Sequence, residues 1–380
     1  MSKAPRGLLG RIAAGAVSFT VLTYVLAIGL SFGLVTSRQF AGQLASIRVH
    51  FFTGAFFIYP IITPIPVDLL LLTDTCIIIY VACLIVAFRS RDGFLNGLQR
   101  LRQVGQISFK SSWLVGMPLV SSALLLIVLV ASIVLSQAGV SSGQLCTPPN
   151  MHLPNPCPSQ AELYASLTYA PISEEIAFRI TTLGLLVAVV TIWKNRSIES
   201  ESRPRISSLI VASFLSPESA KAKVGLPTIT ANGRHGIHWS EWILLLTTSS
   251  FFGIAHVLSG ETDWGVGKAV TAAISGLALG VVYLGYGAYA AILLHWFFDF
   301  YFETLTVGAD VFRGAVVTLP GLVFLATLIV GTVSIVVALT WIVRRIARDE
   351  IPTTYKPPEA APYSVQVRSL HHRQVRQNRI

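Results

Sequence analysis

The chain has 380 residues, of which 53% are hydrophobic and only 12% are charged, and its formal net charge is +10. Soluble domains carry roughly 25% charged residues, so this composition excludes a cytosolic enzyme, a disordered regulator and a basic nucleic-acid-binding module. The basic residues lie mainly between long apolar runs. In such a chain they report the orientation of a membrane protein rather than binding to nucleic acid.

Eight apolar runs reach or approach the length of about 20 residues that a helix needs to cross a membrane. They are Ile12–Val35, Val67–Phe88, Ser112–Leu135, Leu163–Trp193, Trp242–Leu258, Lys268–Tyr286, Ala288–Leu305 and Val317–Val343. The first run is longer than the apolar core of a signal peptide, so we expect a retained helix. The stretch His50–Pro66 is also apolar, but its three prolines predict a surface-lying or re-entrant segment. The pattern predicts an all-α, polytopic transmembrane helical bundle of about eight spans.

The charges of the connecting segments predict the orientation of this bundle. Basic residues gather at the N-terminus, over 89–110, over 194–234 and after 343, and eight spans place all four segments on one side. The segment Ser136–Glu162, on the other side, contains no Lys or Arg. The positive-inside rule then predicts that both termini are cytoplasmic.

The same pattern predicts the organisation of the chain. We expect one bundle over 1–343, a polar cytoplasmic loop over 194–240, and a basic cytoplasmic tail over 344–380 that stays disordered near anionic lipid. Gly276 and Gly280 form a GxxxG pair, which is typical of closely packed transmembrane helices. Cys146 and Cys157 bracket a Pro-rich outer loop, and their spacing leaves open whether they form a disulfide.

The first cluster of ionisable residues lies in the fourth predicted span. An ionisable side chain at the centre of a bilayer costs about 2.5–3.5 kcal/mol on insertion scales, so such residues need partners or a water-filled cavity. Glu175 and Arg179 are four residues apart, which predicts an ion pair on one helix face. Glu174 points about 100° away, and we expect it to project into a cavity that Pro171 helps to open. The alternative is a triad that only stabilises the bundle.

Two further clusters lie in the fifth and seventh spans. His256 follows Phe252 by four residues, and a lone histidine near a helix end is more typical of the membrane interface than of a ligand. His295 and Asp299 share a helix face, as an oriented acid–base pair, two metal ligands or a buried hydrogen-bonded pair would. Because the three clusters occupy three separate spans, together they predict one shared site.

The ordered motifs EExxxR (Glu174–Arg179), FxxxH (Phe252–His256) and HxxxN/D (His295–Asp299) resemble those of a known family. This is the CPBP family of intramembrane endopeptidases, also called CAAX protease or Abi, which includes the type II CAAX prenyl proteases. The resemblance covers about residues 163–305. Many members have Asn where this chain has Asp299.

The resemblance implies an endopeptidase that hydrolyses a membrane-associated, CAAX-type substrate inside the bilayer. Glu174 would activate water, His256 would assist, and His295 and Asp299 would bind the oxyanion or a metal. Glu175 and Arg179 would hold the motif helix. Members of the family have been described both as metalloproteases and as glutamate-dependent proteases. Zinc held by Glu174, His256, His295 and Asp299 and a site without any cofactor therefore both remain open.

The expected partners are membrane lipids and a peptide or protein substrate in or at the membrane, and no nucleic acid. The default location is the plasma membrane, or the endoplasmic reticulum in a eukaryotic cell. Two other functions stay open: a non-catalytic membrane partner or immunity-type protein of the same fold, and a proton-coupled transporter. The sequence shows no internal repeat, which many transporters would have.

The predicted orientation also sets the depth of the site. Glu174 lies about 11 residues, or ~16 Å along a helix, from the outer surface, whereas the CAAX enzymes are expected to act from the cytosolic face. Either the cavity is deep and the helix ends differ from those predicted, or the substrate is not a cytosolic prenylated tail.

Overall fold

The computed structural model describes residues 6–49, 52–56, 59–62, 66–104, 110–144, 158–258 and 263–349. Cys146, Cys157 and the tail from residue 350 lie outside the described residues. The chain divides into two units after Val336. In the second unit the described residues, 337–349, continue the last helix.

Helices dominate the described part of the chain. The α-helices are α1 (Arg6–Thr36), α2 (Arg38–Ala45), α3 (Leu69–Arg89), α4 (Phe94–Val104), α5 (Trp113–Gln137), α6 (Gln160–Glu175), α7 (Thr182–Asn195), α8 (Ile206–Leu215), α9 (Pro217–Lys223), α10 (Ile229–Asn232), α11 (Trp239–Leu258), α12 (Val266–Tyr286), α13 (Ala288–Trp296), α14 (Phe302–Phe312) and α15 (Leu319–Asp349). Two π-helical segments, η1 (Ile176–Thr181) and η4 (Phe297–Tyr301), join α6 to α7 and α13 to α14.

The strands are short and form three two-stranded antiparallel ladders. They pair β1 (Arg48–Val49) with β4 (Val67–Asp68), β2 (Phe52–Phe56) with β3 (Tyr59–Ile62), and β5 (Gly143–Gln144) with β6 (Asp263–Trp264). The hairpin β2–β3 occupies the Pro-rich stretch that was expected to lie on the surface or re-enter the membrane.

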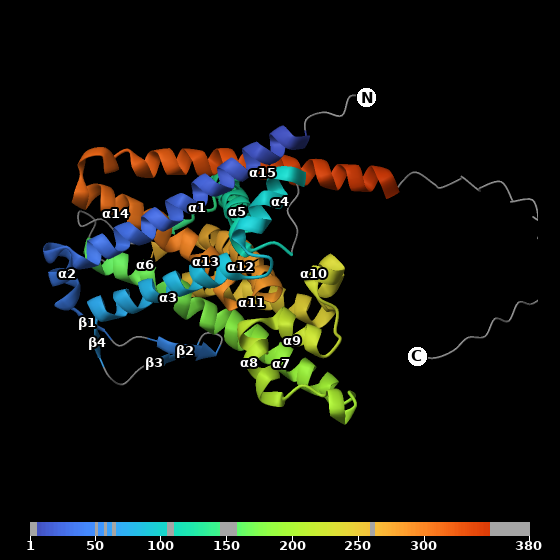
Figure 1. Cartoon of the computed structure of the whole chain (residues 1–380). Helices are drawn as coiled ribbons and strands as arrows, with labels where there is room; N and C mark the ends of the chain where they lie inside the picture. Colours follow the sequence, from blue (N-terminus) through green and yellow to red (C-terminus); the bar gives the residue numbers. More distant parts are fainter. Residues whose placement is uncertain are drawn as a thin grey trace, which may run out of the picture. The chain divides into compact units, whose positions relative to one another are not determined.

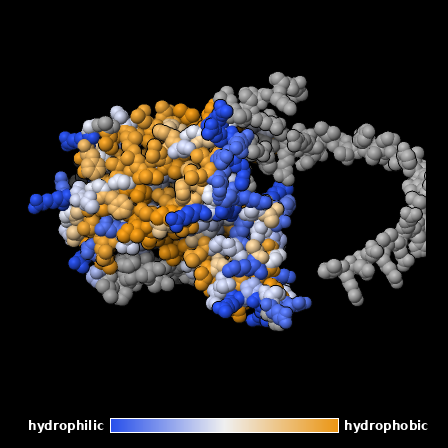
Figure 2. Space-filling view, in the orientation of Figure 1, coloured by the Kyte–Doolittle hydropathy of each residue, from blue (hydrophilic) through white to orange (hydrophobic). Residues whose placement is uncertain are grey.

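Within the described residues, seven helices are long and apolar enough to cross a membrane. They are α1, α3, α5, the continuous α6–η1–α7, α11, α12 and α15. In Figure 2 apolar side chains form a broad band over the helices of the first unit, and hydrophilic side chains gather over the region of α8–α10. These features confirm an all-α, polytopic membrane bundle.

The eighth expected span, Ala288–Leu305, is helical but is not among the seven. Its segments α13, η4 and α14 follow one another without a gap over 288–312. Helix α13 packs against α3, α6 and α12 (Figure 1), and the side chains of Leu294, Trp296 and Phe297 are fully buried. Because its neighbours shield it, this helix can carry ionisable residues that a lipid-facing helix would not tolerate.

The polar loop expected over 194–240 is folded rather than extended. It contains α8, α9 and α10. A buried ion pair joins it to α11, since Lys221 Nζ lies 2.8 Å from Glu241 Oε2. Leu209 and Ala220 are buried, and Ala220 belongs to one hydrophobic cluster with Leu183, Leu245 and Tyr283 of α7, α11 and α12.

Helices α11 and α12 approach each other closely along glycines. A Cβ at Gly253 would overlap the carbonyl oxygen of Ala269, and one at Gly280 would overlap the side chain of Leu245. A Cβ at Gly276 would lie 3.1 Å from both Phe252 and Arg179. The predicted GxxxG pair on α12 is thus a packing surface, and it brings α11 and α12 together beside the second motif.

We expect the substitution Gly253→Ala to lower the thermal unfolding temperature in detergent, because the added methyl group meets rigid backbone. Overpacking of this kind costs about 1–3 kcal/mol. The matched control is Gly29→Ala on α1, where an added Cβ meets no described atom within 4 Å. Equal unfolding temperatures for the two variants would contradict the close packing of α11 on α12.

Candidate active site

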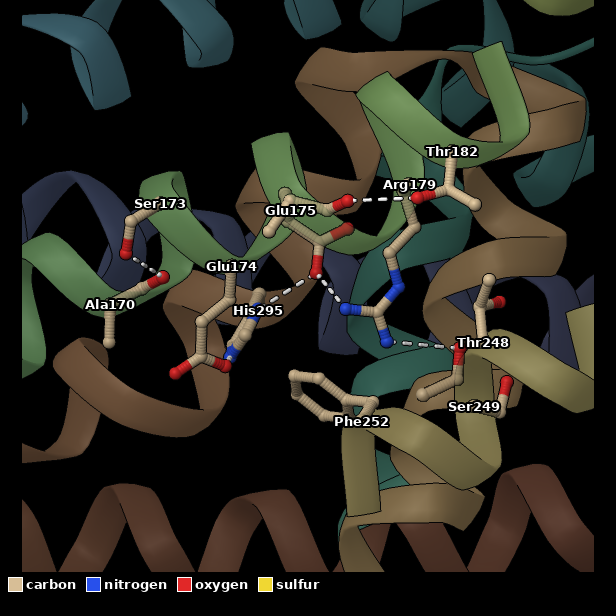
Figure 3. A network of polar contacts seen from close by, with 12 residues as sticks. Ala170, Ser173, Glu174, Glu175, Arg179, Thr182, Thr248, Ser249, Phe252 and His295 are labelled. Atoms are coloured by element: carbon tan, nitrogen blue, oxygen red, sulfur yellow. Dashed lines mark hydrogen bonds and ion pairs between the residues drawn. The ribbon is translucent and has the colours of Figure 1, made fainter. Parts of the chain in front are cut away.

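The Glu175 carboxylate joins the first motif to the third. Its side chain is fully buried at the end of α6. Its Oε1 atom accepts hydrogen bonds from Arg179 Nη1 at 3.0 Å and from His295 Nδ1 at 2.8 Å (Figure 3). The predicted Glu175–Arg179 ion pair is therefore present, and the same oxygen also orients the imidazole on α13.

Arg179 extends this network to the other two helices of the site. Its side chain is only 1% exposed. Nη2 donates to the carbonyl oxygen of Gly276 on α12 at 3.2 Å, and the guanidinium lies 4.2 Å from the ring centroid of Phe252 on α11. Because Gly276 has no side chain, the Arg179 guanidinium has room beside its backbone. The sequence predicted only close helix packing at Gly276 and did not indicate that this residue makes room for Arg179.

The second ring nitrogen of His295 faces the other two carboxylates. Nε2 lies 3.1 Å from Asp299 Oδ2 and 3.5 Å from Glu174 Oε2. The side chains of Glu174 and Asp299 are 30% and 27% exposed, whereas that of Glu175 is sealed. The network therefore has a closed side, which positions the histidine, and an open side, which presents two carboxylates to an incoming molecule.

His256 lies at the rim of this arrangement, near the end of α11. Its Nδ1 atom is 2.8 Å from the Phe252 carbonyl oxygen. The Phe252 ring lies 4.8 Å from the His256 ring and 5.7 Å from the His295 ring, measured between centroids. All six residues singled out in the sequence thus belong to one region, with Phe252 between the two imidazoles.

The helices of the first and third motifs each contain a π-helical segment at the motif itself. Segment η1 begins directly after Glu175 and contains Arg179, and η4 contains Asp299. Thr182 Oγ1 donates to the carbonyl oxygen of Ala177, five residues earlier, at 3.0 Å. Such segments are rare and recur at functional sites. The sequence did not indicate them.

The side chains of this site include residue types that bind metals. Glutamate, aspartate and histidine are suitable zinc ligands. Among the described residues, however, no three His, Cys, Asp or Glu side chains form a group that could hold a metal ion. Both His295 nitrogens are already close to carboxylates. A metal would have to displace the contacts between Nε2 and the carboxylates of Glu174 and Asp299.

We expect Arg179→Ala to destabilise the protein by about 3–5 kcal/mol, because it leaves the Glu175 carboxylate buried without its counter-charge. Chemical unfolding in detergent measures this loss. The control is Arg100→Ala, since the Arg100–Asp92 pair is partly exposed and such pairs contribute about 0–1 kcal/mol. Equal losses for the two variants would show that Glu175 does not depend on Arg179.

Comparison with known proteins places these residues in one matched segment. Residues 159–301 match the family model described as Type II CAAX prenyl endopeptidase Rce1-like. No curated protein and no solved structure matches the chain. The matched segment contains all six site residues and nearly coincides with the expected core over 163–305.

The match supports a CAAX-type protease of the membrane that acts on a protein or peptide substrate. Together with the seven apolar helices, it supports an integral, multi-pass membrane protein. It favours neither a transporter nor a non-catalytic partner. The resemblance drawn from the three motifs is confirmed, since residues 159–301 match the model of the Rce1-like type II CAAX prenyl endopeptidase domain.

Proposed function

We propose that this protein is an intramembrane endopeptidase that hydrolyses a membrane-associated, CAAX-type substrate with water activated by Glu174. One observation carries the proposal: Glu174 and Asp299 flank His295 Nε2 on the exposed side of the network, while buried Glu175 holds the other ring nitrogen. A carboxylate can act as the general base, and an oriented imidazole N–H beside it can donate a hydrogen bond to the oxyanion.

In the proposed reaction the Glu174 carboxylate takes a proton from water as the hydroxyl oxygen attacks the scissile carbonyl carbon. The carbonyl oxygen becomes an oxyanion, which accepts a hydrogen bond from an imidazole N–H. The tetrahedral intermediate then collapses, the C–N bond breaks, and Glu174 returns the proton to the leaving amine. The products are a peptide with a new carboxyl terminus and a peptide with a new amino terminus.

Asp299 gives this chain a different division of roles from relatives that carry Asn at this position. An Asn amide can donate a hydrogen bond to an oxyanion, whereas an ionised Asp can only accept. We therefore assign oxyanion binding to His295 Nε2, assisted by His256 at the rim. Asp299 accepts the Nε2–H hydrogen bond before the substrate binds and gives this N–H up to the oxyanion, while Glu175 holds the ring from the closed side throughout.

The surrounding bundle agrees with a substrate that reaches the site within or at the membrane. The site residues lie on α6 and η1, on α11, and on α13 and η4, among apolar helices. We propose the plasma membrane as the default location, or the endoplasmic reticulum in a eukaryotic host. We also propose that both termini are cytoplasmic, which requires α13–η4–α14 to cross the membrane as an eighth span beside the seven.

We expect Glu174→Gln to lower kcat by about 10²- to 10⁴-fold, the usual contribution of a general base. The assay follows cleavage of a farnesylated CAAX peptide by the purified protein in detergent, with products identified by mass. The matched control is Glu199→Gln, which changes an exposed glutamate outside the site and should leave the rate unchanged. Full activity of the Glu174→Gln variant would contradict a mechanism in which Glu174 activates the water.

We expect the cleavage rate to be unchanged after treatment with a strong zinc chelator, because a carboxylate rather than a metal activates the water. A zinc metalloprotease treated in parallel serves as the control for chelation. Loss of activity that is restored by added Zn²⁺ would contradict the proposal and assign Glu174, His295 and Asp299 to a metal instead.

A further inference from the structure

A hairpin strand that lies outside the matched segment reaches the first motif. Cα atoms of β2 lie within 8 Å of Cα atoms of α6 and η1 (Figure 1), and β3 makes no comparable approach among the described residues. Since η1 begins directly after Glu175, β2 lies beside the helix end that carries Glu174. The sequence indicated only that this Pro-rich stretch lies on the surface or re-enters the membrane.

The outer edge of β2 has no strand beside it. In the part of the chain that the structure describes, β2 pairs with β3 alone. Because β2 is the strand nearer to α6 and η1, its outer edge is on the side of the motif. An unpaired edge presents N–H and C=O groups and is a template for a further strand. Segment η1 lies near the middle of the 36-residue apolar helix Gln160–Asn195, and at membrane depth unpaired backbone groups are costly.

The register of the hairpin shows which backbone groups point outward. Ala55 pairs with Pro60, and the next pair, Phe56 with Tyr59, closes the hairpin. Pro60 has no N–H, so this pair cannot exchange the two bonds of a hydrogen-bonded pair. It is therefore the other kind of pair, in which the N–H and C=O of Ala55 both point to the outer edge of β2. Pro60 offers an acceptor but no donor on the opposite edge, so β2 has the more complete edge.

The strand is irregular just before these outward groups. The register shifts between Phe52 and Gly54, and such bulges recur next to active sites, where they redirect or end the pairing. A glycine inside a strand often marks a place where another backbone approaches closely. Regular pairing along the outer edge is therefore confined to the part of β2 from Gly54 to Phe56.

We propose that the substrate binds as an extended strand along the outer edge of β2, and that this pairing presents the scissile bond to Glu174. This inference rests on the proposed protease function. Paired strands lie about 4.8 Å apart, so a peptide on β2 comes within reach of the Glu174 side chain at the adjoining helix end. Main-chain hydrogen bonds then provide the affinity, as in other cases of strand addition, and an extended backbone leaves the scissile carbonyl accessible.

The test uses farnesylated CAAX peptides that each carry one backbone N-methyl group, bound to the Glu174→Gln variant so that turnover does not enter. Successive N–H groups of a strand point to opposite edges. We therefore expect methylation of the residue that pairs with Ala55 to raise Kd about tenfold, the usual effect of one lost hydrogen bond. Methylation of either neighbouring residue should change Kd less than twofold. Equal effects at adjacent positions would overturn strand pairing.

A change in the hairpin tests the same contact from the side of the protein. Ala55→Pro removes the outward donor without removing a bond to β3, and prolines are tolerated at strand edges. It should raise KM for the unmethylated peptide about tenfold with little change in kcat. The matched control is Pro60→Ala, which changes the opposite edge of the same hairpin and should leave KM unchanged. Equal KM values for the two variants would overturn the proposal. If Ala55→Pro lowers the unfolding temperature, the peptide series decides, because it leaves the hairpin intact.

The inference and the proposed mechanism can fail separately. Alternating effects of N-methylation on Kd, together with unimpaired cleavage by Glu174→Gln, would overturn the glutamate mechanism alone. Uniform effects on Kd, together with cleavage that requires Glu174, would overturn strand pairing alone.

Discussion

One oxygen atom of Glu175 holds the site together. Oε1 accepts a hydrogen bond from Arg179 and another from His295, so a single buried carboxylate fixes the first motif against the third. Arg179 then reaches Gly276 and Phe252 on two further helices. Removing one partner of a buried ion pair strongly destabilises a protein, but the presence of the pair does not by itself show that it stabilises the fold. In this protein the network orients His295, so that the second ring nitrogen faces Glu174 and Asp299.

The charges of the site separate into a sealed part and an open part. Glu175 and Arg179 lie in the interior and pair with each other, whereas Glu174 and Asp299 remain partly exposed. A substitution in the sealed part should act first on folding, and one in the open part should act first on chemistry. The aspartate at position 299 adds a negative charge to the open part.

Helix periodicity explains which features could be predicted from the sequence. A spacing of four residues was enough to predict the Glu175–Arg179 pair and the shared face of His295 and Asp299, and the apolar runs predicted the bundle. The bond between Glu175 and His295 joins residues 120 positions apart, and no local pattern encodes it. The π-helical segments were missed because they change the helix geometry without a distinctive composition. The central helix α13 was expected as an ordinary span, since a sequence does not indicate which helix its neighbours will surround. The helices within 194–240 were not predicted, because the charged and polar residues of this segment indicated a loop.

The most direct test of this account is an experimental structure of the Glu174→Gln variant with an uncleaved peptide bound. The account predicts that the scissile carbonyl carbon lies beside residue 174, either about 3–3.5 Å away or separated by one water molecule. It also predicts that the carbonyl oxygen lies toward His295 Nε2. A peptide bound instead in the shallow hollow on α11, lined by Leu246, Ser250 and Ile254, with no contact to Glu174 or His295, would contradict it.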